Sequence, residues 1–131
     1  EDLYTFAKDI IVPTIKDGGI LLLDGDMGAG KTTFVQQIIN ALGQPSITSS
    51  SPTYTIVNIY DTTPVIYHLD LYRLQTQADI DQLDLEQYFN KPNSITIIEW
   101  ASLLSPTEIP KAAIQLQFII ETGTQRRIQY V

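Results

Sequence analysis

The feature that most constrains this chain is the segment Gly25-Asp26-Met27-Gly28-Ala29-Gly30-Lys31-Thr32, which matches the pattern G-x-x-x-x-G-K-[ST]. An unbroken apolar run, ILLLD at 20–24, precedes it, and apolar residues recur at helical spacing over 34–42 after it. A short continuous apolar run is typical of a strand that is covered on both faces. This order predicts a phosphate-binding loop between a buried strand and a helix.

The residue types of this loop explain its expected chemistry. Glycines let the backbone adopt conformations that strain other residues, so that successive N–H groups converge on phosphate oxygens. Lys31 can then reach the β- and γ-phosphates, and the Thr32 hydroxyl can coordinate Mg²⁺. The helix that begins here adds the partial positive charge of its amino end. We therefore expect the loop to bind nucleotide phosphates together with Mg²⁺.

The rest of the chain alternates helical and strand patterns. Periodicity predicts a helix at 2–16 that is kinked or broken near Pro13 and ended by Gly18-Gly19, a loop at 47–53, an antiparallel hairpin of 55–60 with 65–70, one or two short acidic helices within 78–89, a strand region at 94–100 and a closing hairpin around 122–125. We expect a single domain over residues 1–131. Its predicted fold class is α/β, a P-loop NTPase-like three-layer sandwich whose mixed sheet is parallel near the glycine-rich turn and antiparallel at its edges.

Composition narrows the classes of function. The chain has 131 residues, with 8 Lys and Arg against 15 Asp and Glu, a net charge of −7 that is the wrong sign for holding DNA or RNA by phosphate neutralisation. It has no cysteine, which excludes disulfides, thiolate metal sites and a catalytic thiol. No apolar stretch approaches the roughly 18 residues of a membrane span, and no signal peptide opens the chain. We expect a cytoplasmic protein without membrane or DNA partners.

Two acids stand at the ends of apolar strands. A nucleotide hydrolase needs a carboxylate near its metal, and Asp70 after 65–69 and Glu99 after 94–98 both qualify. Their spacing does not rank them for a metal or a water role. Thr53 in the hydroxyl-rich loop is a candidate contact of the γ-phosphate. For two other residues the simplest interpretation is structural: His68 supports the sheet, and Trp100, which follows Glu99, packs against its neighbours.

Four segments of the chain, in order and spacing, closely resemble the bacterial TsaE family, also called YjeE. They are GDMGAGKTTF (25–34), SPTYTIVNIY (51–60), YHLDLYRL (67–74) and IEW (98–100). The members of that family are small ATPases required to make threonylcarbamoyladenosine in tRNA.

The resemblance implies an ATP- and Mg²⁺-dependent ATPase. It implies that Thr32 and Glu99 hold Mg²⁺ and that Asp70 positions or polarises the attacking water. Thr53 would act as a switch-like contact near the γ-phosphate, Lys31 would assist catalysis, and Trp100 would belong to the functional surface. The residues that would bind the ATP phosphates are Asp26, Met27, Gly28, Ala29, Gly30, Lys31, Thr32 and Thr33.

The implied partners are the TsaD and TsaB proteins, which carry the threonylcarbamoyl transfer, so that tRNA is reached indirectly through the complex. The chain has only three arginines, and a well-placed arginine finger is worth roughly 10³ to 10⁵ in rate. We therefore expect slow hydrolysis by the chain alone and acceleration by its partners. Two alternatives remain open: a small-molecule kinase built on the same loop, and a non-catalytic docking module whose surface ATP stabilises.

Overall fold

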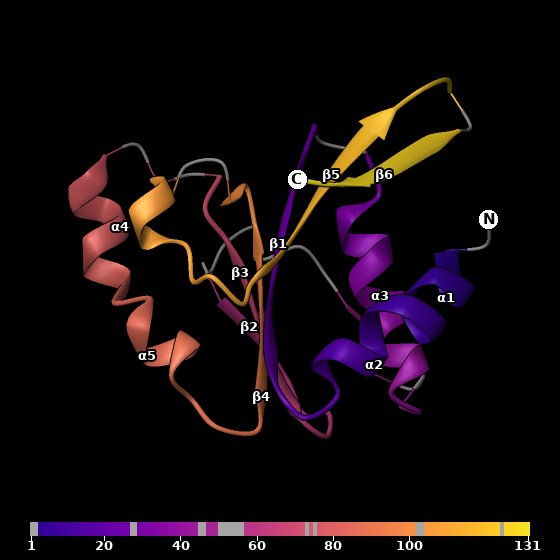
Figure 1. Cartoon of the computed structure of the whole chain (residues 1–131), viewed down its shortest axis with the longest axis horizontal. Coiled ribbons are helices and arrows are strands. Elements are labelled where there is room, and N and C mark those ends of the chain that lie inside the picture. Colours follow the sequence, from indigo (N-terminus) through magenta and orange to yellow (C-terminus); the bar gives the residue numbers. More distant parts are fainter. Residues whose placement is uncertain are drawn as a thin grey trace.

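The computed structural model describes residues 3–26, 29–44, 47–49, 57–72, 74, 76–101, 104–123 and 125–131. In these residues a six-stranded sheet carries helices on both faces (Figure 1). The strands are β1 (Gly19–Gly25), β2 (Val57–Tyr60), β3 (Val65–Asp70), β4 (Ser94–Glu99), β5 (Ile114–Ile120) and β6 (Arg126–Tyr130). The helices are α1 (Leu3–Phe6), the π-helix η1 (Ala7–Ile11), α2 (Val12–Ile15), α3 (Lys31–Ala41), α4 (Gln77–Leu83), α5 (Glu86–Phe89) and the 3-10 helix η3 (Pro106–Glu108).

The sheet has the strand order β2-β3-β4-β1-β5-β6. Strand β1 lies between β4 and β5 and is parallel to both, and β3 is parallel to β4. The edge strands β2 and β6 are antiparallel to their neighbours β3 and β5. The predicted mixed sheet, parallel beside the glycine-rich loop and antiparallel at its edges, is confirmed.

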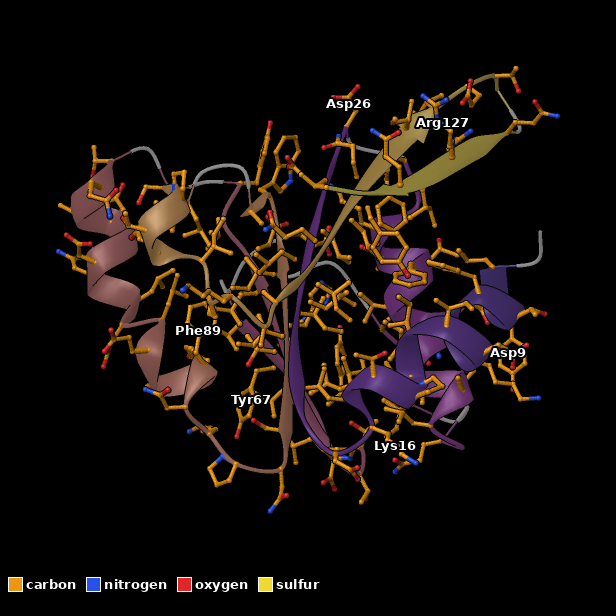
Figure 2. All side chains as sticks on the ribbon, in the orientation of Figure 1. Asp9, Lys16, Asp26, Tyr67, Phe89 and Arg127 are labelled. Carbon is orange, nitrogen blue, oxygen red and sulfur yellow. The ribbon has the colours of Figure 1, made fainter. Side chains whose placement is uncertain are left out.

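Helices cover the two faces of the sheet as separate layers (Figure 1). Segments α1 to α3 lie on one face, and α4 and α5 on the other. Leu21 and Leu23 belong to the first hydrophobic cluster and Leu22 to the second, since successive side chains of a strand point to opposite faces. Figure 2 shows Tyr67 and Phe89 on the α4–α5 side, where both pack against the second cluster. Burial on both faces explains the unbroken apolar run of β1.

The amino-terminal helical region changes its geometry along its length. Leu3–Phe6 is α-helical, Ala7–Ile11 forms a π-helix, and Val12–Ile15 is α-helical again. Pro13 has no N–H to donate to the preceding turn, and widened turns of this kind are one way a helix accommodates such a loss. The interruption predicted near Pro13 is therefore confirmed, in the form of a π-helical turn.

The shorter elements also follow the sequence pattern. The predicted hairpins are β2 with β3 and β5 with β6, and the acidic segment forms the two helices α4 and α5. Helix α4 begins with a capping box, in which the Thr76 hydroxyl accepts the Asp79 N–H at 3.2 Å. Residues 47–49 of the predicted loop form neither helix nor strand, whereas 50–56 lie outside the described residues. None of the helices in the described part of the chain has the length and apolar character that a membrane crossing requires.

Phe34 joins three elements in the core, and its removal should be costly. Its ring is fully buried and lies 5.7 Å from the ring of Phe6 and 5.5 Å from that of Phe118, centroid to centroid. We expect Phe34→Ala to lower the free energy of unfolding by about 3–5 kcal/mol, measured by urea denaturation. The control Ile59→Ala, at an apolar side chain that is 64% exposed on β2, should change it by less than about 0.5 kcal/mol. Equal losses in both variants would contradict this packing.

Candidate functional site

The glycine-rich loop joins β1 to α3 at the carboxyl end of the parallel strands. Figure 2 shows Asp26 just beyond the end of β1, at the upper edge of the sheet. Helix α3 begins at Lys31 after Gly30, whose φ of 102° lies in the left-handed region that favours glycine. Apart from Gly30 itself and its neighbours in the chain, no described atom lies within 4 Å of the position that a Gly30 Cβ would occupy. An open turn at the amino end of a helix fits a phosphate group.

A second glycine of the loop is required by close packing. Gly25 has φ of 142°, and a Cβ there would lie only 2.5 Å from the carbonyl oxygen of Phe118 on β5. Any other residue would push β1 and β5 apart at the point where the loop begins. Of the other predicted loop residues, Ala29 is buried and Thr33 is exposed. Met27 and Gly28 lie outside the described residues.

The Lys31 ammonium is held inside the loop. The side chain is 5% exposed, and Nζ donates a hydrogen bond of 2.6 Å to the carbonyl oxygen of Gly25. Nζ also lies 4.0 Å from the centroid of the Trp100 ring, a cation–π contact. Because a buried charge is costly without such partners, these contacts keep a cation in place at the loop.

Trp100 has a backbone conformation that is unusual for a bulky residue. It follows β4 directly with φ of 62°, a backbone conformation that costs a bulky residue roughly 1–3 kcal/mol and is found most often at functional sites. Its ring lies 5.0 Å from the ring of Tyr72 and covers Lys31. The packing expected for this residue is present, but its partner is the loop lysine. The only sequence signal for this contact was its position next to Glu99.

The two strand-end acids lie side by side. Asp70 and Glu99 are register partners at the ends of the parallel strands β3 and β4. They share the face of Ile66 and Ile95, which is the face covered by α3. The structure thus brings both predicted acids to the start of α3.

Glu99 contacts the helix that carries the predicted magnesium ligand. It is 3% exposed, and its Oε2 accepts a long hydrogen bond of 3.4 Å from the Thr32 hydroxyl. A hydroxyl and a carboxylate are the hard oxygen donors that Mg²⁺ prefers. Within the described residues no group of three or more His, Cys, Asp or Glu is placed to hold a metal. The Thr32 hydroxyl and the Glu99 carboxylate fit Mg²⁺, which commonly takes one or two protein oxygens and completes its shell with phosphates and water.

The surroundings of Asp70 shift the pKa of its carboxyl group. Burial raises the pKa of Asp70 above its usual value of 3.8, and the nearby charge of Glu99 raises it further. The Tyr72 N–H, which donates to Oδ1 at 2.9 Å, opposes that rise in pKa, as do Lys31 and His68. The hydrogen bond from Tyr72 also fixes the orientation of the carboxylate.

Pattern reasoning missed a contact of His68. Its ring is fully buried, and Nε2 lies 2.5 Å from Oε2 of Glu99 while Nδ1 lies 3.0 Å from the hydroxyl of Tyr60. The period-2 alternation of β3 placed His68 and Asp70 on one face, but the contact to Glu99 depends on the pairing of β3 with β4. His68 is thus buried in the sheet, as a structural residue would be, and it also contacts Glu99, a candidate metal ligand.

The start of the predicted switch loop is attached to α3. The Gln36 side chain accepts the Ser49 N–H at 2.6 Å and donates to the carbonyl of Ile47 at 2.8 Å. The Ser49 hydroxyl donates to the carbonyl of Thr32 at 3.2 Å. The segment leading to Thr53 is therefore bound to the helix turn that carries Thr32. Thr53 itself lies outside the described residues.

Comparison with known proteins gives one consistent result. Residues 1–128 match the family model described as "Threonylcarbamoyl adenosine biosynthesis protein TsaE". The chain is 37% identical over 131 residues to the tRNA threonylcarbamoyladenosine biosynthesis protein TsaE of Bacillus subtilis, covering 99% of this chain and 79% of that one. It is 35% identical over 120 residues to the protein of that name from Rickettsia bellii, covering 88% and 81%. The crystal structure of YdiB from Bacillus subtilis superposes with a TM-score of 0.67 at 28% identity, covering 97% and 78%.

The raised pKa of Asp70 makes a prediction about stability. A folded state that raises the pKa of an acid binds its proton more tightly than the unfolded state, so the charged Asp70 costs stability at neutral pH. Asp70→Asn keeps an oxygen for the Tyr72 N–H without the charge. We expect this variant to be more stable than the wild type at pH 7, by a margin that shrinks as the pH falls through the folded-state pKa.

Urea denaturation at pH 7 and at about pH 4 measures this difference, since the usual pKa of an aspartate lies near the lower value. Asp9→Asn, at an exposed acid of η1, is the control and should change the unfolding free energy by less than about 0.5 kcal/mol. An Asp70→Asn protein less stable than the wild type at pH 7 would disprove the burial cost.

Proposed function

The chain belongs to the TsaE family, and on this basis we propose that it is an ATP- and Mg²⁺-dependent ATPase acting in the biosynthesis of threonylcarbamoyladenosine in tRNA. The contact between Thr32 and Glu99 beside the phosphate loop carries this proposal. A phosphate loop alone is compatible with many ligands. A hydroxyl on the first turn of α3 and a carboxylate at the end of β4 are the oxygen donors that a magnesium-bound triphosphate needs.

Lys31 is proposed to bind the terminal phosphates. Its ammonium is now paired with the neutral carbonyl of Gly25 and with the Trp100 ring. A charge-assisted hydrogen bond to a phosphate oxygen is roughly twice as strong as one between neutral groups. A bound triphosphate can therefore compete successfully for this lysine. The loop N–H groups and the amino end of α3 would hold the remaining phosphate oxygens.

Thr32 and Glu99 are proposed to hold Mg²⁺. When bound, the ion would supply positive charge that neutralises the negative charge developing on the phosphates. Asp70 is proposed to orient the attacking water and to accept its proton as ATP is cleaved to ADP and phosphate. Its raised pKa makes it a stronger base than an exposed aspartate, which favours this role. The Tyr72 N–H holds the carboxylate in one orientation for that transfer.

TsaD and TsaB are the proposed partners, and hydrolysis would reset their complex with this chain. Arg127 pairs with Glu121 at 3.0 Å, and Arg126 donates to the carbonyl of Thr122, so both are engaged within the β5–β6 hairpin. Arg73 lies outside the described residues. These engagements favour a slow ATPase that partners complete. The net charge of −7 favours contact with tRNA through the partners.

Partner dependence can be measured directly. We expect the rate of ATP hydrolysis to rise by about tenfold or more when TsaD and TsaB are added, because partners can supply positive charge to the transition state. Equal turnover with and without them would contradict partner stimulation.

Transfer of the γ-phosphate to a metabolite instead of water would favour the kinase alternative. Repeated cycles of modification supported equally by a non-hydrolysable analogue would favour the docking module.

Substitutions of Asp70 and Glu99 should affect different steps, ATP hydrolysis in the first case and magnesium-dependent ATP binding in the second. We expect Asp70→Asn to lower kcat by about 10²- to 10⁴-fold, the usual worth of a general base, while MgATP affinity changes little. Glu99→Ala should instead weaken the magnesium-dependent part of ATP binding, and Lys31→Ala should weaken ATP binding with or without the metal. Asp9→Asn serves as the control of unchanged activity. Wild-type turnover in both acid variants would show that the wrong carboxylates were chosen.

A further inference from the structure

A buried line of side chains crosses three adjacent strands next to the proposed magnesium ligands. Tyr60 on β2 contacts His68 on β3, and His68 contacts Glu99 on β4, with distances of 3.0 Å and 2.5 Å. These strands are neighbours in the sheet (Figure 1). The three residues are 6%, 0% and 3% exposed, respectively. The functional roles proposed above use only the last of them.

The chemistry of the groups sets the direction of the hydrogen bonds. An ionised carboxylate only accepts, so Nε2 of His68 donates to Glu99. Nδ1 then accepts from the Tyr60 hydroxyl when the ring is neutral and donates to the hydroxyl oxygen when the ring is protonated, so both nitrogens are held in either state. Each bond fixes the next group along the line, because a ring held at both nitrogens cannot rotate. The position of the Glu99 carboxylate therefore depends on the ring of His68 and, through it, on Tyr60.

The contacts of Glu99 are unequally divided between its two oxygens. Within the described part of the chain, Oε2 is in contact with both His68 and Thr32, whereas Oε1 has no hydrogen-bond partner. The two contacts of Oε2 thus fix the orientation of the carboxylate that is proposed to hold Mg²⁺. Hydrogen bonds that orient ligand groups in this way tune many metal sites.

We propose that His68 is a positioning residue of the magnesium site, which holds Oε2 of Glu99 in place while Tyr60 holds the ring. The inference rests on the proposed function, since it takes Glu99 as a magnesium ligand. Preorganisation of the carboxylate removes an ordering cost from metal binding. A histidine that only stabilised the sheet would affect folding and every kind of nucleotide binding alike. A positioning histidine affects the metal-dependent part alone.

Two substitutions at position 68 distinguish a positioning role from a structural one, because their side chains differ in length. The amide nitrogen of Gln can occupy the place of Nε2, whereas that of Asn extends only as far as Nδ1. We expect His68→Asn to lower the apparent affinity for Mg²⁺ by about 10- to 100-fold and His68→Gln to keep it within about threefold of wild type. The measurement is calorimetric titration of MgCl₂ into the protein saturated with a non-hydrolysable ATP analogue.

Tyr60 supplies a second, milder test. Tyr60→Phe removes one hydroxyl and should weaken Mg²⁺ binding by about fivefold, the worth of one hydrogen bond. In the His68→Asn background it should add nothing, because the path to Glu99 is already broken. Tyr130→Phe, at a tyrosine that is 62% exposed on β6, is the matched control and should change nothing. If His68→Asn does not fold, the single variant Tyr60→Phe decides the question.

Affinity for the analogue in EDTA completes the design. It should stay within about twofold of wild type in all variants, since no contact to the phosphates is changed. Unaltered Mg²⁺ affinity in His68→Asn and Tyr60→Phe, with a wild type that depends normally on Mg²⁺, would overturn this inference alone. An equal loss of affinity in EDTA would show a structural role and overturn it as well. A wild type that binds no nucleotide at all would overturn the proposed function, and this inference with it.

Discussion

Parallel pairing of β1, β3 and β4 is the constraint on which the site depends. Parallel strands end at the same edge of a sheet, so the loop after β1, Asp70 at the end of β3 and Glu99 at the end of β4 meet there. The pairing requires a strand that can be covered on both faces, and Leu21, Leu22 and Leu23 are each at most 1% exposed. The apolar sequence of β1 thus determines where the polar groups of the site converge.

The charges of the site are fixed before any ligand arrives. Lys31 is held by a carbonyl and an aromatic ring, and Glu99 by a histidine and a hydroxyl, although both side chains are almost fully buried. Polar and aromatic partners of this kind offset the cost of burying a charge. A net charge of −7 does not prevent binding of a polyanion, because distant charges are screened beyond about 8 Å at physiological salt.

The sequence could predict those parts of the fold that are encoded locally. The strand at 20–24, the helix after the loop and both hairpins follow from periodicity and short connections, and the structure contains each of them. The register between β3 and β4 is not local, and it alone creates the contact between His68 and Glu99, 31 residues apart. Trp100 likewise has a left-handed backbone and packs on Lys31 and Tyr72, contacts with residues distant in the sequence that no pattern near Trp100 encodes.

The structure also distinguishes Asp70 from Glu99, two acids to which the sequence pattern alone could not assign separate roles. Asp70 and Glu99 occupied equivalent strand ends in the sequence, but Glu99 accepts the Thr32 hydroxyl and Asp70 accepts the Tyr72 backbone N–H. This difference supports the metal role for one acid and the water role for the other. Thr53, Met27 and Gly28 lie outside the described residues, and their roles stay predictions.

The central claim is that this loop, with Thr32 and Glu99, binds ATP as its magnesium complex. Calorimetric titration of the wild-type chain with ATP, once with Mg²⁺ and once with EDTA, tests it most directly. The account predicts measurable binding that is at least about tenfold tighter with the metal, a difference of about 1.4 kcal/mol. No binding heat under either condition, or the same affinity in both, would contradict it.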